Sequence, residues 1–118
     1  MYVLIVDDEF GLADVTGRLL ADRGYEAAIE INGKLGLASL AKRRADLVIA
    51  DLKMPIMDGI EMIRRMRADP ELANIPTIMM TAVPEAVPKG DLGQHDALIV
   101  KPYKIADLLA LIEKLTKA

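Results

Sequence analysis

Three aspartates stand at the ends of short apolar runs and could do chemistry together. Asp7 and Asp8 follow the run at residues 2–6, and Asp51 closes the run at residues 46–51. Such runs are typical of strands buried on both faces, and the carboxyl ends of neighbouring parallel strands meet at one edge of a sheet. Converging carboxylates repel one another, so the cluster should hold a proton or bind a cation. Oxygen ligands without His or Cys favour Mg²⁺ or another hard divalent cation such as Mn²⁺.

A hydroxyl group and an amine end two further apolar runs. Thr81 follows residues 77–80, and Lys101 follows residues 97–100. Each of these residues has a plain structural explanation when taken alone, as the end of a strand or as half of an ion pair. Together, a lysine, a hydroxyl and a divalent cation are what phosphoryl oxygens require around them, and a carboxylate can act as the nucleophile. We therefore expect phosphoryl transfer to an aspartate.

Apolar runs alternate with amphipathic stretches from one end of the chain to the other. Strands are expected at residues 2–6, 26–31, 46–51, 77–80 and 97–100. This alternation predicts an α/β fold with a parallel sheet covered by helices on both sides. Right-handed crossovers favour a doubly wound, flavodoxin-like sheet of five strands in the order 2-1-3-4-5. In that order the strands that end at the aspartates are neighbours.

The positions of the helices follow from spacing and capping residues. Apolar side chains repeat at helical spacing between residues 12 and 20 and again between residues 105 and 115. Asn32 and Asp58 are good N-caps for two further helices. Gly24 can take the left-handed conformation that ends the first helix.

Residues 82–96 interrupt this pattern, because they contain two prolines and two glycines. In a helix interior a proline costs about 3 kcal/mol and a glycine about 1 kcal/mol. The fourth helix is therefore expected to be short or irregular.

Composition excludes several functions. The 118 residues suffice for one domain, residues 1–118, with a net charge of −3 and no cysteine. The scattered Lys and Arg residues form no basic surface for DNA or RNA. No apolar run is long enough to cross a membrane, so we expect a cytoplasmic domain that contacts neither membrane nor nucleic acid.

Four segments together resemble the receiver domain of response regulators from two-component signalling, over essentially the whole chain. They are Val6-Asp7-Asp8-Glu9, residues 51–59 (DLKMPIMDG), Thr81-Ala82 and Lys101-Pro102-Tyr103. The resemblance implies a phosphorelay switch. A sensor histidine kinase or a histidine phosphotransfer protein would donate the phosphoryl group, and a downstream effector protein would receive the signal. Such a switch is not an enzyme that turns over a metabolite, although it would catalyse its own phosphotransfer and dephosphorylation.

The resemblance also implies a role for each residue of the metal site. Asp51 would be the phosphoacceptor, next to a Mg²⁺ ion. Asp8 would bind that ion directly and Asp7 mainly through water. Lys53, two residues after Asp51, would offer its backbone carbonyl to the ion.

The remaining roles concern the phosphoryl group and the output. Thr81 and Lys101 would each contact a phosphoryl oxygen. The family usually has Tyr or Phe three residues before this lysine, but here the residue is Leu98. This departure puts the family's usual threonine–aromatic switch in question. Our hypothesis is instead that residues 82–96 are mobile and become ordered on phosphorylation.

Two other classes compete with a working receiver. A pseudo-receiver that acts only as a protein-binding module would not need the complete set of acids, threonine and lysine. An α/β phosphatase would need further catalytic residues and usually a cap domain, for which 118 residues leave no space. A flavin-binding flavodoxin is disfavoured in addition, because no Gly/Ser/Thr-rich phosphate loop follows the first strand. The receiver is therefore the preferred hypothesis.

Overall fold

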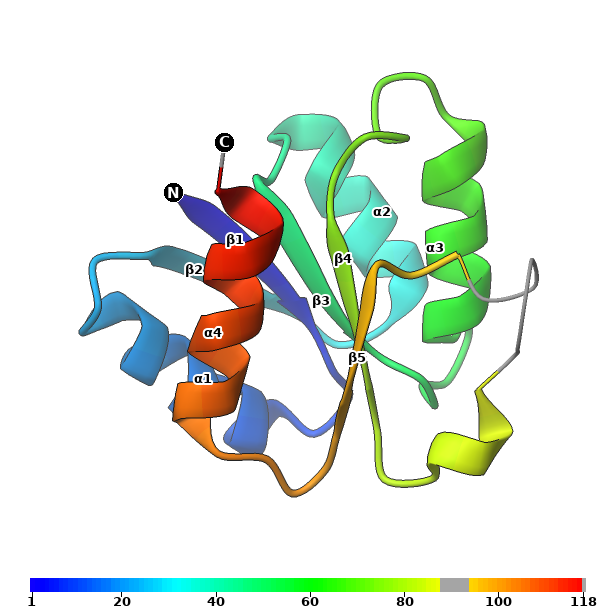
Figure 1. Cartoon of the computed structure of the whole chain (residues 1–118). Helices are drawn as coiled ribbons and strands as arrows, with labels where there is room; N and C mark the ends of the chain where they lie inside the picture. The colour runs from blue at the N-terminus through cyan, green and yellow to red at the C-terminus, as the bar shows by residue number, and fades with distance from the viewer. Residues whose placement is uncertain (88–93, 118) are drawn as a thin grey trace.

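A parallel sheet of five strands forms the centre of the molecule (Figure 1). The computed structural model describes residues 1–87 and 94–117. Within them the strands are β1 (Tyr2–Val6), β2 (Glu26–Glu30), β3 (Leu47–Asp51), β4 (Thr77–Thr81) and β5 (Ala97–Val100). Their order is β2-β1-β3-β4-β5, and every pair of neighbours is parallel. The predicted fold class and strand order are confirmed.

Two layers of helices cover the sheet. Helices α1 (Phe10–Ala21) and α4 (Ile105–Thr116) pack on one face, and α2 (Gly33–Lys42) and α3 (Gly59–Ala68) pack on the other (Figure 1). All strands run in the same direction, so their carboxyl ends meet at one edge of the sheet, at the bottom of Figure 1.

The predicted capping residues are found where the helices begin and end. The side chain of Asn32 accepts the N–H of Leu35 at 2.9 Å, and Asp58 accepts the N–H of Glu61 at 2.9 Å. These bonds satisfy backbone donors that an uncapped first turn would leave free. Gly24 has a φ of +91°, which explains why the chain can turn after α1 and enter β2.

The three central strands are buried along their whole length, which explains their continuous apolar sequences. Four methionines complete the interior: Met62 and Met66 of α3, and Met79 and Met80 of β4 are almost inaccessible to solvent. Methionine adapts well to irregular gaps. Met62, Met66 and Met79 pack on the side of the sheet that α3 covers, and Met80 packs on the side that α1 and α4 cover.

The orientation of α1 could not be read from its apolar spacing. Leu12, Val15 and Leu19 lie on the exposed side of the helix, although they repeat at helical spacing. The small residues Ala13 and Gly17 face the sheet instead. A Cβ added at Gly17 would sit 3.7 Å from Ala27, so the helix lies close to β2.

The segment after β4 is irregular in its described part, as expected. A single 3₁₀ turn occupies Pro84–Ala86, and residues 94–96 lead into β5. Pro88, Gly90 and Gly93, on which part of the expectation depended, lie outside the described residues. The hypothesis that phosphorylation orders residues 82–96 stays a prediction.

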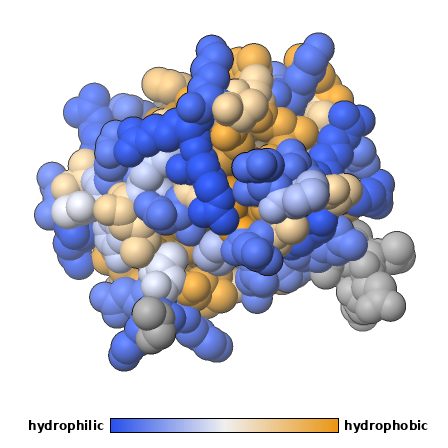
Figure 2. All heavy atoms as spheres, turned by 90° about the horizontal axis from the view of Figure 1, so that it is seen from above, coloured by the Kyte–Doolittle hydropathy of each residue, from blue (hydrophilic) through white to orange (hydrophobic). Residues whose placement is uncertain are grey.

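Hydrophilic residues cover most of the end of the molecule where the strands begin (Figure 2). Hydrophobic residues show only between them in this view. Within residues 1–87 and 94–117, no helix has the length and apolar character required to cross a membrane.

Candidate functional site

Three carboxylates meet at the carboxyl edge of the sheet. Asp7 and Asp8 follow β1, and Asp51 ends β3, which pairs directly with β1. One carboxylate oxygen from each residue lies within 4.8 Å of the others. Asp7 and Asp51 are buried, whereas Asp8 is exposed to solvent. The topology thus brings together the aspartates that the sequence pattern had grouped.

Lys101 reaches into this cluster from the end of β5. Its Nζ lies 3.0 Å from Asp7 Oδ2 and 3.2 Å from Asp51 Oδ1. Its backbone N–H donates to Thr81 O at 2.8 Å, and the peptide bond to Pro102 is cis. The lysine side chain is only 12% exposed, so both ion pairs are largely shielded from water.

Thr81 is buried at the end of β4, beside the same edge. Its Oγ1 accepts the backbone N–H of Val83 at 2.9 Å. Because a hydroxyl both accepts and donates, this bond leaves the Thr81 proton free for another acceptor.

Burial and charge act against each other at the two central groups. Burial raises the pKa of the Asp51 carboxyl above its usual range; Lys101 opposes this rise, and Asp7 adds to it. Burial lowers the pKa of Lys101, but its contacts with Asp7 and Asp51 outweigh burial and raise the pKa overall. Lys101 is therefore charged at neutral pH. Three carboxylates facing this one ammonium group leave an excess of negative charge, and their oxygens fit a hard divalent cation.

The loop after Asp51 is tight, and a glycine makes its geometry possible. A Cβ added at Gly59 would overlap the carbonyl oxygen of Asp51 and lie 3.2 Å from Met79 Sδ. The N–H of Gly59 donates to Leu52 O at 3.1 Å. Helix α3 can therefore begin directly against the end of β3. We did not anticipate this contact, although the Asp-Gly pair at a helix start was a usable signal.

The same loop contains a strained turn at Ile56. This residue has a φ of +69°, and the N–H of Met57 donates to Pro55 O at 2.7 Å. This is a γ-turn with positive φ at its central residue, a rare and strained conformation for a β-branched side chain.

A small cleft of about 290 Å³ opens over the acidic cluster. Its lining residues come from four loops at the carboxyl edge: Asp8, Glu9, Asp51, Lys53, Thr81, Ala82, Val83 and Lys101. The exposed Lys53 thus lies at the cleft, where the resemblance places a metal ligand. The predictions did not include the bond from the N–H of Glu9 to Asp7 Oδ1 at 3.0 Å.

Some larger hollows lie away from this chemistry. One of about 480 Å³ lies between α2 and α3 and has the leucines Leu37, Leu40 and Leu72 in its lining. None of the clustered aspartates lines it. The small polar cleft is therefore the better candidate for the functional site.

Comparisons with known proteins agree with this site. Residues 3–113 match the family described as the response regulator receiver domain. The chain is 37% identical over 113 residues to the sensory transduction protein RegX3 of Mycobacterium tuberculosis, covering 93% of this chain and 48% of RegX3. It is 34% identical over 112 residues to the DNA-binding response regulator MtrA of Mycobacterium leprae, covering 93% and 48%. The chain thus spans about half the length of the curated relatives it matches.

Solved structures share the fold over nearly the whole chain. The signal receiver domain of a signal transduction histidine kinase from Syntrophus aciditrophicus superposes with a TM-score of 0.86 at 29% identity, covering 98% of this chain and 89% of that one. The receiver domain of the sensor histidine kinase PA1611 from Pseudomonas aeruginosa gives a TM-score of 0.87 at 24% identity, covering 99% and 98%. The PA1611 structure has a magnesium ion coordinated in its active-site cleft.

The fold and these matches define a signalling domain of the phosphoacceptor class. The chain belongs to the response regulator receiver domain family and serves as a switch in two-component signalling.

Proposed function

We propose that Asp51 is the residue that accepts the phosphoryl group. The observation that carries this proposal is the placement of its carboxylate, which lines the cleft, lies 3.2 Å from the Lys101 ammonium group and clusters with Asp7 and Asp8. A nucleophile in this place has both a positive charge and cation ligands beside it. Both would oppose the repulsion between a carboxylate and an incoming phosphoryl group.

The reaction exchanges one bond to phosphorus for another. An oxygen of Asp51 attacks the phosphorus of a phosphohistidine, so an O–P bond forms while the N–P bond breaks. The released imidazole takes up a proton, and Asp51 becomes an acyl phosphate. Lys101 pairs with one phosphoryl oxygen. Thr81, whose hydroxyl proton is free, donates to another.

A divalent cation fits the same cluster. Asp7, Asp8 and Asp51 would hold Mg²⁺, and the backbone carbonyl of Lys53 would complete the protein ligands. When bound, the cation would neutralise part of the charge that otherwise repels the phosphoryl donor. The magnesium seen in the PA1611 receiver domain supports this assignment by analogy of fold.

The donor protein has to cover the rim of the cleft to bring its histidine to Asp51. An apolar groove of about 400 Å³ adjoins the cleft and shares Glu9, Ala82 and Lys101 with it. Three exposed apolar residues of α1 line this groove: Leu12, Val15 and Leu19. We assign it to a sensor histidine kinase or a histidine phosphotransfer protein.

A docking variant separates this assignment from the chemistry. Val15→Glu should leave the rate of labelling by acetyl phosphate within about twofold of wild type, because Val15 lies outside the cleft. It should slow transfer from a phosphorylated histidine phosphotransfer protein that serves the wild type. If the wild type and Val15→Glu accept the phosphoryl group from that protein at equal rates, the groove is not the docking site of the donor.

The output and the location of the domain stay predictions. The curated relatives include DNA-binding regulators, and this chain spans about half of their length. We infer that the phosphorylated domain acts on an effector protein or effector domain and does not itself bind nucleic acid. The cytoplasmic location expected from the sequence belongs to the same set of predictions.

Intact mass spectrometry tests the assignment of Asp51. Incubation with Mg²⁺ and acetyl phosphate should add one phosphoryl group, about 80 Da, to the wild type. Asp51→Asn should show no gain, and EDTA should abolish the gain in the wild type. Asp14→Asn is the matched control, because Asp14 lies on α1, pairs only with Arg18 in the described structure, and should be labelled normally.

Two outcomes would overturn the proposal. A mass gain that persists in Asp51→Asn would place the phosphoryl group on another residue. A wild type that gains no mass from either acetyl phosphate or a phosphohistidine donor would instead favour the pseudo-receiver, a module that only binds a protein partner.

A further inference from the structure

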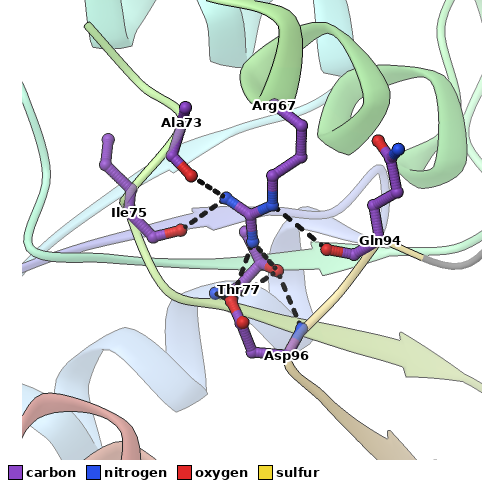
Figure 3. A network of polar contacts seen from close by, with 6 residues as sticks. All are labelled: Arg67, Ala73, Ile75, Thr77, Gln94 and Asp96. Carbon is purple, nitrogen blue, oxygen red and sulfur yellow. Dashed lines mark hydrogen bonds and ion pairs between the residues drawn. The ribbon is translucent and has the colours of Figure 1, made fainter. Parts of the chain in front are cut away.

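The side chain of Arg67, in the last turn of α3, joins several backbone segments where β4 and β5 begin (Figure 3). All five N–H donors of its guanidinium group are used. Nε donates to Gln94 O at 3.1 Å, Nη1 to Ala73 O at 3.0 Å and Ile75 O at 2.9 Å, and Nη2 to Thr77 Oγ1 at 3.0 Å and Asp96 Oδ2 at 2.8 Å.

Thr77, the first residue of β4, and Asp96, the residue before β5, are also bonded directly to each other. Asp96 Oδ2 also accepts the N–H of Thr77 at 2.8 Å, and the N–H of Asp96 donates to Thr77 O at 3.1 Å. The Arg67 side chain is 19% exposed. Arg65, two residues earlier on α3, instead pairs with Glu61 at the surface and is 59% exposed. Arg67 is thus built into the structure in a way that its neighbour is not.

Strand β5 has few other contacts that fix its position along β4. It has four residues and pairs with β4 alone. Leu98 and Val100 are exposed, and of its four residues only Ile99 is buried. Ile99 and the partly buried Ala97 set which side of β5 faces the core, and the bonds at the start of the strand set where it begins along β4. The cross-link at Asp96 and Thr77 therefore supplies a fixed starting point.

Lys101 follows β5 directly, so its position depends on that starting point. A shift of β5 by one residue would move Lys101 by about 3.3 Å. That distance is as long as the contacts from Lys101 Nζ to Asp7 and Asp51, at 3.0 and 3.2 Å. We propose that Arg67 is a positioning residue for the phosphorylation reaction, because it anchors β5 and thereby sets the place of Lys101. This rests on the proposed role of Lys101 toward the phosphoryl group.

The test compares the rate of Asp51 labelling with the affinity for Mg²⁺. Arg67→Ala should lower the rate of Asp51 labelling by acetyl phosphate at saturating Mg²⁺ by about tenfold or more, because a displacement of about 1 Å at a reacting group can cost that much. The affinity for Mg²⁺ alone, measured by titration calorimetry, should not fall, because a displaced Lys101 takes positive charge away from Asp7 and Asp51. Arg67 itself makes no hydrogen bond to a residue of β1 or β3 in the described structure.

Matched variants separate positioning from loss of charge and loss of fold. Arg65→Ala removes the same charge from the same helix and should leave both measurements at wild-type values. Arg67→Lys keeps the charge but cannot form the five-bond fork, so it should lower the labelling rate by an intermediate factor. In a Lys101→Met background, Arg67→Ala should have no further effect on the rate.

Several results would overturn the proposal. They are an unchanged labelling rate in Arg67→Ala, an equal loss of labelling and Mg²⁺ affinity, and a full additional loss in the Lys101→Met background. If Arg67→Ala does not fold, the labelling rate and the Mg²⁺ affinity are compared in Arg67→Lys and Asp96→Asn instead. If the wild type itself is not labelled at Asp51, the proposed function has failed. In that case the position of Lys101 can still be followed by the NMR chemical shift of its Nζ. If this shift is the same in Arg67→Lys as in the wild type, the anchoring role of Arg67 is refuted.

Discussion

Replacing Gly59 with alanine tests how closely α3 approaches β3, the strand that ends at Asp51. The added Cβ would overlap the carbonyl oxygen of Asp51 and lie 3.1 Å from its carbonyl carbon and 3.2 Å from Met79 Sδ. The overlapping oxygen belongs to the backbone of β3, which is buried along its whole length. Neither the strand nor the helix can withdraw without breaking contacts elsewhere.

The expected loss follows from two opposing terms. Overpacking of this kind costs about 3 kcal/mol, and the better helix propensity of alanine returns up to about 1 kcal/mol. The free energy of unfolding should therefore fall by about 2 kcal/mol. A domain of this size has an unfolding entropy of roughly 0.25 kcal/mol/K, so Tm should drop by about 8 °C.

Gly11→Ala is the matched control for the same chemical change. Nothing lies within 4 Å of a Cβ added at Gly11, and the residue is exposed in the first turn of α1. Alanine there should raise the free energy of unfolding by about 0.5 kcal/mol and Tm by about 2 °C. Circular dichroism and urea titration measure both variants. A Gly59→Ala protein as stable as wild type would refute the close approach.

Three further predictions concern strain, a buried hydroxyl and pH. Ile56→Asn should raise the free energy of unfolding by about 0.5–1 kcal/mol, because Asn tolerates positive φ and the side chain of Ile56 is 80% exposed; a loss in urea titration would contradict the strain. Tyr103→Phe should lower the free energy of unfolding by about 1 kcal/mol, because it removes the 3.0 Å hydrogen bond to Thr16. In a Thr16→Val background the loss should be smaller; an equal loss would show that this bond does not stabilise the fold. Burial lowers the pKa of His95, so the unfolded chain binds its proton more readily. Stability should therefore decline as pH falls below about 6.5 and level off below the folded pKa; His95→Gln should lose this part of the pH dependence, and an unchanged slope would exclude the residue.

The strands and the acidic cluster were predictable because their signals are local. Parallel strands buried on both faces need continuous apolar runs, and their shared direction brings the residues that follow them to one edge. Asp7, Asp51 and Lys101 could therefore be grouped from three separate segments. The caps Asn32 and Asp58 were equally local, since each bonds a backbone N–H within one turn.

Other features depend on distances that a sequence pattern does not contain. The spacing of Leu12, Val15 and Leu19 indicated a helix but not its buried face, which is set by how closely Gly17 lets α1 approach β2. The close contact at Gly59 and the five bonds of Arg67 likewise join residues whose proximity arises only after the sheet forms.

The enclosed methionine side chains have a consequence for oxidative chemistry. Of the seven methionines, Met62, Met66, Met79 and Met80 are almost fully enclosed, whereas Met1 is 50% exposed. Oxidation to the sulfoxide makes the side chain polar and requires access of the oxidant to sulfur. Met1 should therefore react at once with dilute peroxide, and the four enclosed sulfurs should react only as fast as the core opens. Their oxidation rate therefore measures how often the core of the domain opens.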